Sequence, residues 1–357
     1  MAFLYLTVVV NNIDWFQLLY KCSYVSSYWS VADSMKLPTL KIYLLVLTVN
    51  VFVTVTLKAD TLPGLSALSE SVVRESAIAF VNTTTSPGLE GATLTVDDGN
   101  RESEQWRSSL GFSAEFTLKK HIFNGYWGLA VVGGSLNDKL ELVGDSGQPV
   151  QVELTRDVVA LRGSFGLSYP VTQHFKLRPY LSLSVSDLQT ESIVDGLLTT
   201  APAGSADTTA VFNSSAQMLS TTGSVDALYS RWYGGNRLEL SAHYHLIYTD
   251  AFSEDNPVLE TEAWNDVLQL KSRFSGPTRL TSIGRPWRWL LYANHSNFLS
   301  QDNLSLGYTS LFEFGAGMEW QMNIKPMDWF GWQMIGLKAG VITSSNVEGY
   351  FMGLTAR

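Results

Sequence analysis

Apolar and polar side chains alternate with a period of two along most of the chain after residue 88. In the clearest stretch, 159–169, apolar residues and one glycine occupy the odd positions, and mostly small or polar residues occupy the even ones. A β-strand has this period because its successive side chains point to opposite faces. Several stretches are longer than the roughly five to six residues usual in soluble sheets. They reach the about nine to eleven residues of a strand that crosses a membrane, and so predict an all-β fold with membrane-length strands.

We expect these strands to close into a transmembrane antiparallel β-barrel of about twelve strands, preceded by a signal peptide and a short helix. An even number of strands leaves both ends of the barrel on one side of the membrane, and secretion places that side in the periplasm. The expected strands are 88–97, 105–118, 124–135, 150–169, 177–189, 215–232, 237–249, 264–275, 286–297, 304–321, 332–343 and 347–356.

The connections between these strands separate into two classes by length and charge. Connections after even-numbered strands are mostly short and carry basic residues such as Lys119, Lys120 and Lys176. Connections after odd-numbered strands include the long segments 190–214 and 250–263, and they are rich in Asp and Glu. Bacterial barrels have short periplasmic turns and longer external loops. Both properties support the strand count and predict that the two long segments face the outside.

Composition favours the same class of protein. Charged residues make up only 16% of the chain, aromatic residues 12%, and the mean hydropathy is +0.06. Because lipid-facing and lumen-facing residues alternate in a barrel strand, hydropathy averages out along it. A helical membrane protein would need repeated apolar spans of about 20 residues, and a soluble β-sandwich would not need such long apolar faces opposite polar ones. The net charge of −9 argues against a nucleic-acid partner.

Tryptophan is frequent and lies mostly near the ends of the expected strands. The amphipathic indole ring favours the level of the lipid headgroups, so these residues predict two interface girdles. The candidates are Trp106, Trp127, Trp232, Trp264, Trp287, Trp289, Trp320, Trp329 and Trp332.

The region before the barrel has the pattern of an export signal. A short basic stretch precedes the apolar run 42–57 and then Lys58 and Ala59, which predicts a signal peptide over 35–59 with cleavage near Ala59. An uncleaved membrane anchor is the alternative. Met35 is the better start, so that 1–34 is expected to be a non-native upstream extension. Cys22 is the only cysteine, and a mature chain without it has no disulfide or thiol chemistry.

The segment 60–87 is expected to lead into a barrel that covers 88–357. Apolar residues within 62–82 roughly follow helical spacing. Two interpretations remain open at this point: a lead-in segment in the periplasm, or a helix that enters the barrel lumen.

Charged and polar residues on the faces opposite the apolar ones are expected to line the lumen. They would form either a structural network of ion pairs or a pore that mildly favours anions, since cations outnumber anions among them. The candidates are Arg162, Arg178, Arg231, Arg237, His243, His245, Lys271, Arg273, Arg288, Glu239, Glu313, Glu319 and Lys338.

Three groups of residues are of types that can bind a metal or carry catalysis, but their spacing in the sequence disfavours both. His243 and His245 share one face of a strand, but no third metal ligand is identifiable. His295 and Ser296 are adjacent and therefore point to opposite faces, which disfavours a lipid hydrolase. The carboxylates of Glu313 and Glu319 are six residues apart, which is roughly 20 Å along a strand. That distance is too long for the two to act together in acid–base catalysis. We therefore expect no catalytic residues, no metal and no cofactor.

Two segments resemble strands of a known family. VVALRGSFGLSYP followed by FKLRPYLSLSV, within 158–185, and LFEFGAGMEW at 311–320 are similar to translocator strands of the autotransporters. The chain is most similar to solitary autotransporter-like outer-membrane barrels, which lack a passenger. The resemblance covers roughly 90–357 as a pattern, and it implies a twelve-stranded barrel with an N-terminal segment at or in the pore.

Two features depart from that family. Little chain separates residue 60 from the first expected strand, which leaves no room for a sizeable passenger. The chain also ends at Arg357 rather than at the aromatic residue that such barrels usually offer to the assembly machinery. The aromatic pair Tyr350 and Phe351 is an alternative signal.

The expected function is therefore an autotransporter-like barrel of the Gram-negative outer membrane, structural or weakly conducting, without a passenger. The first alternative is a surface barrel that binds partners through 190–214 and 250–263, and an outer-membrane lipid hydrolase is the second. The expected partners are outer-membrane lipids, the barrel assembly machinery and small solutes or ions.

Overall fold

The computed structural model describes part of the second of two compact units, which cover Met1–Ala59 and Asp60–Arg357. Within that unit the described residues are 70–87, 91–97, 101–118, 122–143, 149–195, 214–254, 262–300, 306–322 and 334–356.

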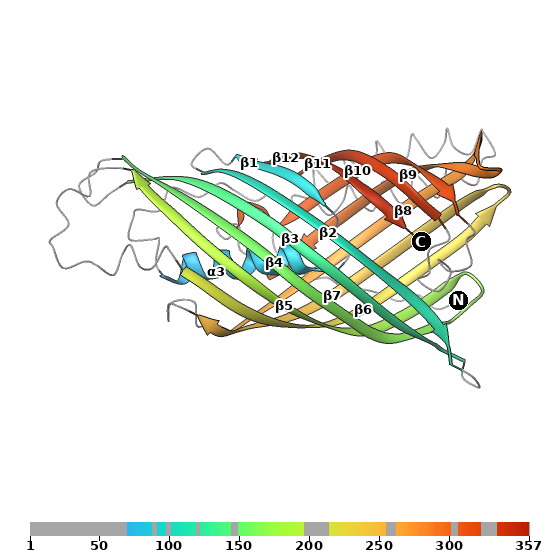
Figure 1. Ribbon diagram of the computed structural model, residues 1–357, viewed down its shortest axis with the longest axis horizontal. Helices are drawn as coiled ribbons and strands as arrows, with labels where there is room; N and C mark the ends of the chain where they lie inside the picture. The colour runs from blue at the N-terminus through green and yellow to red at the C-terminus, as the bar shows by residue number, and fades with distance from the viewer. Residues whose placement is uncertain are drawn as a thin grey trace, which may run out of the picture. The chain divides into compact units, whose positions relative to one another are not determined.

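Twelve strands form a closed barrel in which each strand pairs antiparallel with its neighbours in sequence, and β1 pairs with β12 (Figure 1). The predicted closed barrel of twelve strands is confirmed, and the β-sandwich alternative is wrong. The strands are β1 Ala92–Asp97, β2 Arg101–Thr117, β3 Asn124–Val143, β4 Pro149–Pro170, β5 Phe175–Asp195, β6 Ser214–Tyr233, β7 Asn236–Glu254, β8 Glu262–Ser282, β9 Arg285–Phe298, β10 Ser310–Gln321, β11 Met334–Thr343 and β12 Val347–Ala356.

An apolar band surrounds the outside of the barrel. On β4 it includes Leu161 and Phe165, which are 54% and 65% exposed, and on β5 it includes Leu181 and Leu183, which are 63% and 57% exposed. A continuous band of large exposed apolar side chains is typical of a barrel surface that faces lipid. On β4 the band covers 159–169, which is about the length of a strand that crosses a membrane, roughly nine to eleven residues.

Several strands continue beyond this band. β4 has 22 residues and β5 has 21, about twice what a membrane crossing requires. Past the band, the outward positions become polar and exposed, as at Asp157 on β4 and Gln189 and Glu191 on β5. The barrel wall therefore projects into water at the end where β4 begins and β5 ends.

The two ends of the barrel differ in their connections. At one end, Ile283 and Gly284 link β8 to β9 with φ values of 55° and 69°, the geometry that a two-residue hairpin turn requires. Gly234 and Gly235 link β6 to β7 at the same end. At the other end, the connection 196–213 is the longest of the barrel, although the connection 322–333 at the first end is also long. By the rule for bacterial barrels, we expect this loop end to be external and the short-turn end to be periplasmic.

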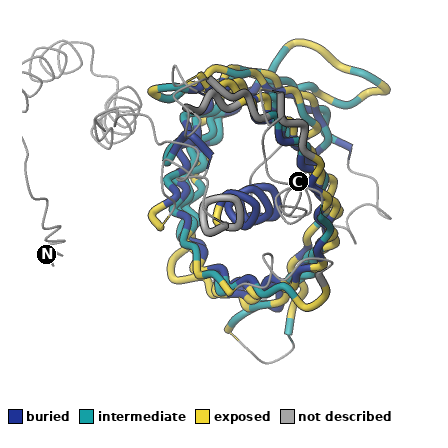
Figure 2. The backbone as a smooth tube through the Cα atoms, turned by 90° about the vertical axis from the view of Figure 1, so that its left-hand side faces the viewer, coloured by how far each residue is buried: buried dark blue, intermediate teal, exposed yellow. Residues whose placement is uncertain are grey.

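A helix, α3 (Glu70–Thr85), lies inside the ring of strands (Figure 2). Its consecutive residues 77–81 are all buried, as expected for a helix that is surrounded on every side. Pro87 follows its last turn and cannot continue the helical hydrogen bonding. In the described part of the chain, no helix is long and apolar enough to cross a membrane.

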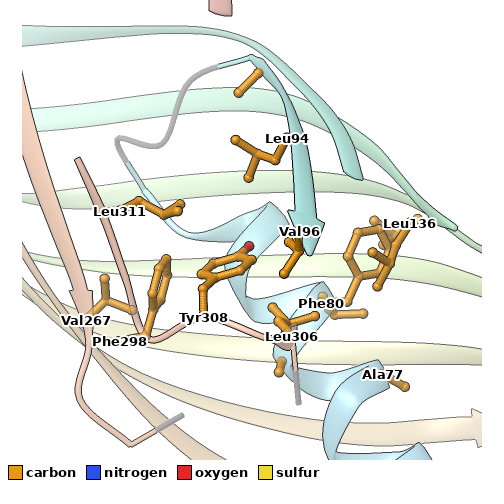
Figure 3. Packing of buried hydrophobic residues seen from close by; sticks show 14 of the residues in the cluster. Ala77, Phe80, Leu94, Val96, Leu136, Val267, Phe298, Leu306, Tyr308 and Leu311 are labelled. Carbon is orange, nitrogen blue, oxygen red and sulfur yellow. The ribbon is translucent and has the colours of Figure 1, made fainter. Parts of the chain in front are cut away.

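The helix and the inner wall near the loop end share one hydrophobic core (Figure 3). Phe80 of α3 is completely buried, and Leu136 of β3 and Val96 of β1 belong to the same cluster. A fully buried large apolar side chain contributes about 1.5–3 kcal/mol relative to its exposed state. The helix is thus a packed part of the barrel.

Several strand boundaries differ from those predicted: β3 ends at Val143 rather than at 135, and β8 ends at Ser282 rather than at 275. β10 begins at Ser310 rather than at 304, because Leu306 and Tyr308 turn into the lumen and are 1% and 2% exposed. Gly307 between them has a φ of 78°, and the Tyr308 hydroxyl donates to Oε1 of Gln105 at 2.7 Å. β1 has only six residues and begins opposite Arg107, part of the way along the barrel.

Candidate functional site

The inner wall of β2 is buried near the loop end and exposed farther along the strand. On the inner face of β2, Ser103 and Gln105 near the loop end are 0% and 1% exposed. Farther along the same face, Ser109, Gly111 and Ser113 are exposed, although they point into the barrel. We call the buried part the loop half and the exposed part the chamber. The chamber begins beyond Arg107 and continues towards the short-turn end.

Buried ion pairs hold the first part of α3 in the loop half. Asp138 of β3 accepts hydrogen bonds from Arg101 at 2.8 Å and from Arg156 at 3.0 Å. Arg156 also donates to the hydroxyl of Ser76 on α3 at 2.8 Å. A buried carboxylate between two guanidinium groups satisfies charges that would otherwise be costly to bury. This cluster therefore fixes the helix to β3 and β4.

The end of α3 is held by three other strands. Arg162 of β4 donates to the backbone oxygen of Thr85. Thr249 of β7 donates to the side-chain oxygen of Asn82 at 2.6 Å, and Gln269 of β8 donates to the backbone oxygen of Pro87 at 3.2 Å. The direction of the helix follows from these contacts. Ser76 meets wall residues nearer the loop end, and Thr85 meets the wall deeper in the lumen.

Acidic side chains on the inner wall are paired with cations or amides. Glu319 of β10 accepts from Arg273 and from the hydroxyl of Thr355, the latter at 2.6 Å. Glu239 of β7 accepts from Arg237 at 2.9 Å. Glu313 of β10 accepts from Arg107 at 3.2 Å and from Asn294 at 3.1 Å. These contacts fit the predicted network of ion pairs better than a set of isolated charges.

Cations also stack on aromatic rings along the inner wall. Arg288 lies 4.9 Å and Arg237 5.7 Å from the ring of Trp232, and Lys338 lies 4.7 Å from the ring of Tyr292. Arg288 donates in addition to the backbone oxygen of Gly235 at 2.9 Å. Stacking of this kind orients a guanidinium group without neutralising it. The short-turn end of the chamber is therefore both basic and aromatic.

A serine, a histidine and an aspartate form a hydrogen-bonded series on the wall made by β6 and β7. Nε2 of His243 lies 2.8 Å from Oγ of Ser241, and Nδ1 lies 2.7 Å from Oδ1 of Asp226. Asp226 also accepts from Arg178 of β5 at 2.7 Å. The next histidine, His245, instead places Nδ1 at 2.9 Å from Oγ of Ser224.

The positions of the predicted lumen residues follow the alternation of each strand. Arg231 is the exception: it lies on the outer face of β6 with Val225, and its guanidinium group is 5.1 Å from the ring of Tyr233. An odd position on β6 points outward because the buried inner residues Ser224 and Asp226 occupy even positions. The inner-face residues are Arg162, Arg178, Arg237, Glu239, His243, His245, Lys271, Arg273, Arg288, Glu313, Glu319 and Lys338.

The tryptophans predicted to form the interface girdles also lie on inner or outer faces according to the alternation of their strands. Trp232 lies on the inner face of β6 and contacts lumen cations, so it does not belong to a lipid girdle. Trp329 and Trp332 lie outside the described residues, as do 196–213 and 255–261 within the two predicted loop segments. The outer-face tryptophans are Trp106, Trp127, Trp264, Trp287, Trp289 and Trp320.

Sequence reasoning did not identify four residues that form buried ion pairs in the lumen: Arg101, Asp138, Arg156 and Asp226. Their positions on inner faces could have been inferred from alternation, but their pairings depend on the register between strands. Across the described residues there is no group of three or more His, Cys, Asp or Glu that could hold a metal ion. His295 stacks on Phe312 on the outer face at 4.2 Å, whereas Ser296 is buried on the inner face.

No protein-family model matches the sequence, and no curated protein matches it. Among solved structures, the chain is similar to the transport unit of the autotransporter AIDA-I from Escherichia coli, with a TM-score of 0.46 and 12% identity over 80% of this chain and 98% of that one. It is also similar to the translocator domain of the autotransporter NalP from Neisseria meningitidis, with a TM-score of 0.45 and 12% identity over 81% of this chain and 100% of that one. The beta domain of the Bordetella autotransporter Brka has a TM-score of 0.44 and 11% identity, over 74% of this chain and 94% of that one.

The assignment of this chain rests on its own geometry, which is a closed antiparallel barrel with an exposed apolar band of membrane height. Closed barrels of this kind span the outer membrane of Gram-negative bacteria. The chain is an outer-membrane β-barrel.

Proposed function

We propose that this chain is an autotransporter-like barrel that its own helix keeps closed, with a structural role and at most a weak conductance. The observation that carries the proposal is the burial of the inner wall in the loop half, where Ser103, Gln105 and Arg107 are at most 2% exposed. Ions cross a barrel through a continuous water-filled lumen. A packed section of lumen removes that path.

The anchors of α3 support a plug that stays in place. Arg156 holds Ser76 near the first part of the helix, and Arg162 and Thr249 hold its last turn. Opening the lumen by moving the helix would expose the apolar core around Phe80 and break these buried hydrogen bonds together. Each lost hydrogen bond to a charged group costs about 1.5–3 kcal/mol. The closed state is therefore expected to dominate.

The charges of the chamber suggest what an opened lumen would favour. Cations outnumber acidic side chains on the described inner wall, and the chamber includes Lys271, Arg273 and Arg288. Rings of basic residues favour anions in a pore. Because many of these cations are paired with Glu239, Glu319 or backbone oxygens, the preference is expected to be mild.

Conductance in planar lipid bilayers tests the proposal. The full chain is compared with a variant that lacks 70–85 and with the double variant Arg162→Met/Asn82→Ala, which removes two anchors of the helix. A shift in electrophoretic mobility between unheated and boiled samples verifies that each barrel is folded. We expect a baseline near zero for the full chain and steady, mildly anion-favouring channels for the deletion. Wide, stable channels from the full chain, or a closed lumen in the folded deletion variant, would contradict the proposal.

A further inference from the structure

The series formed by Ser241, His243 and Asp226 has the connectivity of a catalytic triad. Ser241 and His243 are two residues apart on the inner face of β7, and Asp226 of β6 is the direct register partner of His243. The two ring nitrogens of His243 have different partners: Nε2 meets the serine at 2.8 Å and Nδ1 meets the carboxylate at 2.7 Å. In a serine hydrolase the base contacts the nucleophile through one nitrogen and the orienting carboxylate through the other.

The carboxylate of this series is held in place independently of the histidine. Arg178 donates to Oδ2 of Asp226 from Nε at 3.0 Å and from Nη2 at 2.7 Å, which leaves Oδ1 to accept from His243. Arg178 is itself stacked 4.3 Å from the ring of Tyr126. The side chain of Asp226 is only 1% exposed. Such a support fixes the tautomer and the orientation of the imidazole, which is the role of the third member of a triad.

The proposed nucleophile lies on the inner face of β7 and is partly exposed. Ser241 is half-buried, and the side chain of His243 is 14% exposed, so a small molecule in the chamber reaches them. Lys271 of β8 is the direct register partner of Ser241. A cationic side chain beside the serine stabilises the negative oxygen that develops during acyl transfer.

The adjacent serine and histidine form an internal comparison. Ser224 lies 2.9 Å from His245 through Nδ1, and the two residues are 5% and 1% exposed. This pair has the same residue types one step along the wall but is buried, so it cannot meet a substrate from the chamber. The difference between the two pairs is what an experiment can use.

We propose that Ser241 is the nucleophile of a hydrolytic site that accepts short, water-soluble acyl esters from the periplasmic side. Oγ of Ser241 bonds to the acyl carbon while its proton passes to Nε2 of His243. The ester C–O bond then breaks, and the leaving alcohol takes that proton. Water attacks the acyl-serine with the same histidine as base, which releases the carboxylic acid and restores Ser241. The sum is ester plus water giving acid plus alcohol.

The site is compatible with a closed lumen because it opens only to the chamber. The carbonyl oxygen of Pro87 is bound by Gln269, which is the register partner of His243, so the end of the plug segment lies beside the site on the loop side. Substrate therefore enters and leaves by the short-turn end. This proposal does not depend on whether the barrel conducts.

The test uses the purified, folded full chain. Hydrolysis of p-nitrophenyl butyrate is measured, and a fluorophosphonate probe is applied, with the modified peptide located by mass spectrometry. We expect the adduct on Ser241. We also expect a hydrolysis rate at least 100-fold lower in the Ser241→Ala and His243→Gln variants, as for loss of a nucleophile or its base. The Ser224→Ala variant is the matched control and should retain both signals.

Two outcomes would overturn the proposal. One is hydrolysis by the folded full chain that is no faster than by Ser241→Ala; the other is an adduct on a different serine. Ser241→Ala removes one oxygen atom from a half-buried position, and heat modifiability verifies that this variant folds. Asp226→Asn provides a further measurement. It should lower the rate by roughly 10⁴-fold if Asp226 orients the base, and a folded variant with an unchanged rate would remove it from the site.

Discussion

Gly134 on the inner face of β3 lies directly against Thr84 of α3, so closely that a Cβ atom on the glycine would be 2.9 Å from Cγ2 of the threonine. Carbon atoms at such a distance repel each other, and only the absence of a side chain permits the approach. The helix is therefore fitted to the wall of the barrel. This close contact adds to the packing of α3 against the inner wall in the loop half.

A methyl group at Gly134 is expected to weaken the packing of α3 against β3. The Gly134→Ala variant should lose about 1–3 kcal/mol of stability, the usual cost of an added group in a packed core, and thermal unfolding in detergent measures it. Gly133→Ala is the matched control, because a Cβ at Gly133 meets nothing closer than 3.7 Å. Adding Thr84→Ala to Gly134→Ala should recover part of the loss. Equal effects at 133 and 134 would show that the helix does not press on the wall.

Removal of the buried carboxylate at Asp138 is expected to loosen the attachment of the first part of α3 to the barrel wall. Asp138→Asn leaves Arg101 and Arg156 without their common charge partner, and breaking a buried pair in this way costs about 3–5 kcal/mol. A lower temperature for the heat-modified shift is the measurement. Asp157→Asn, on the exposed outer face of β4, should change that temperature little. Similar shifts for the two variants would contradict the role of the cluster.

A charge in the apolar band is expected to cost more than the same charge beyond it. Leu181→Arg lies within the band on β5 and should destabilise the folded barrel by about 2–4 kcal/mol if it lies near the middle of the bilayer. Gln189→Arg lies on the same face of the same strand, past the band, and should be nearly neutral. Equilibrium unfolding from lipid vesicles in denaturant distinguishes the two. An equal loss of stability in the two variants would show that the apolar band does not end between Leu181 and Gln189.

The fold was largely predictable because alternation is a local property. In the run 159–169, the alternation of apolar and polar residues alone shows which side chains share a face, without any contact to a distant part of the chain. The exception at Leu306 and Tyr308 has a physical cause, since apolar residues in a loop that folds into a core look the same in sequence as the end of a strand. Arg231 and Trp232 were placed on the wrong faces because alternation near a strand end was counted without a fixed register.

The candidate site was much less predictable, because its geometry depends on pairing between strands. His243 and His245 were predicted as two polar residues on one lumen face, but their partners Asp226, Ser241 and Ser224 were not foreseen. Asp226 lies on the neighbouring strand β6, and only the register of β6 with β7 brings it opposite His243. Ser241, two residues before the histidine, was a signal that sequence reasoning could have used. No catalytic residue was expected, and the proposed hydrolytic site departs from that expectation.

Thiol accessibility along the inner wall tests most directly whether the barrel is filled on the loop side and open on the other. Replacing Cys22, the only cysteine, gives a background without thiols. In it, Ser109→Cys probes the chamber and Val158→Cys probes the loop half, where Val158 is 1% exposed. A charged maleimide should modify the Ser109→Cys variant rapidly and the Val158→Cys variant at least tenfold more slowly, until 70–85 is deleted. Equal rates in the intact barrel would contradict a lumen closed by its own helix.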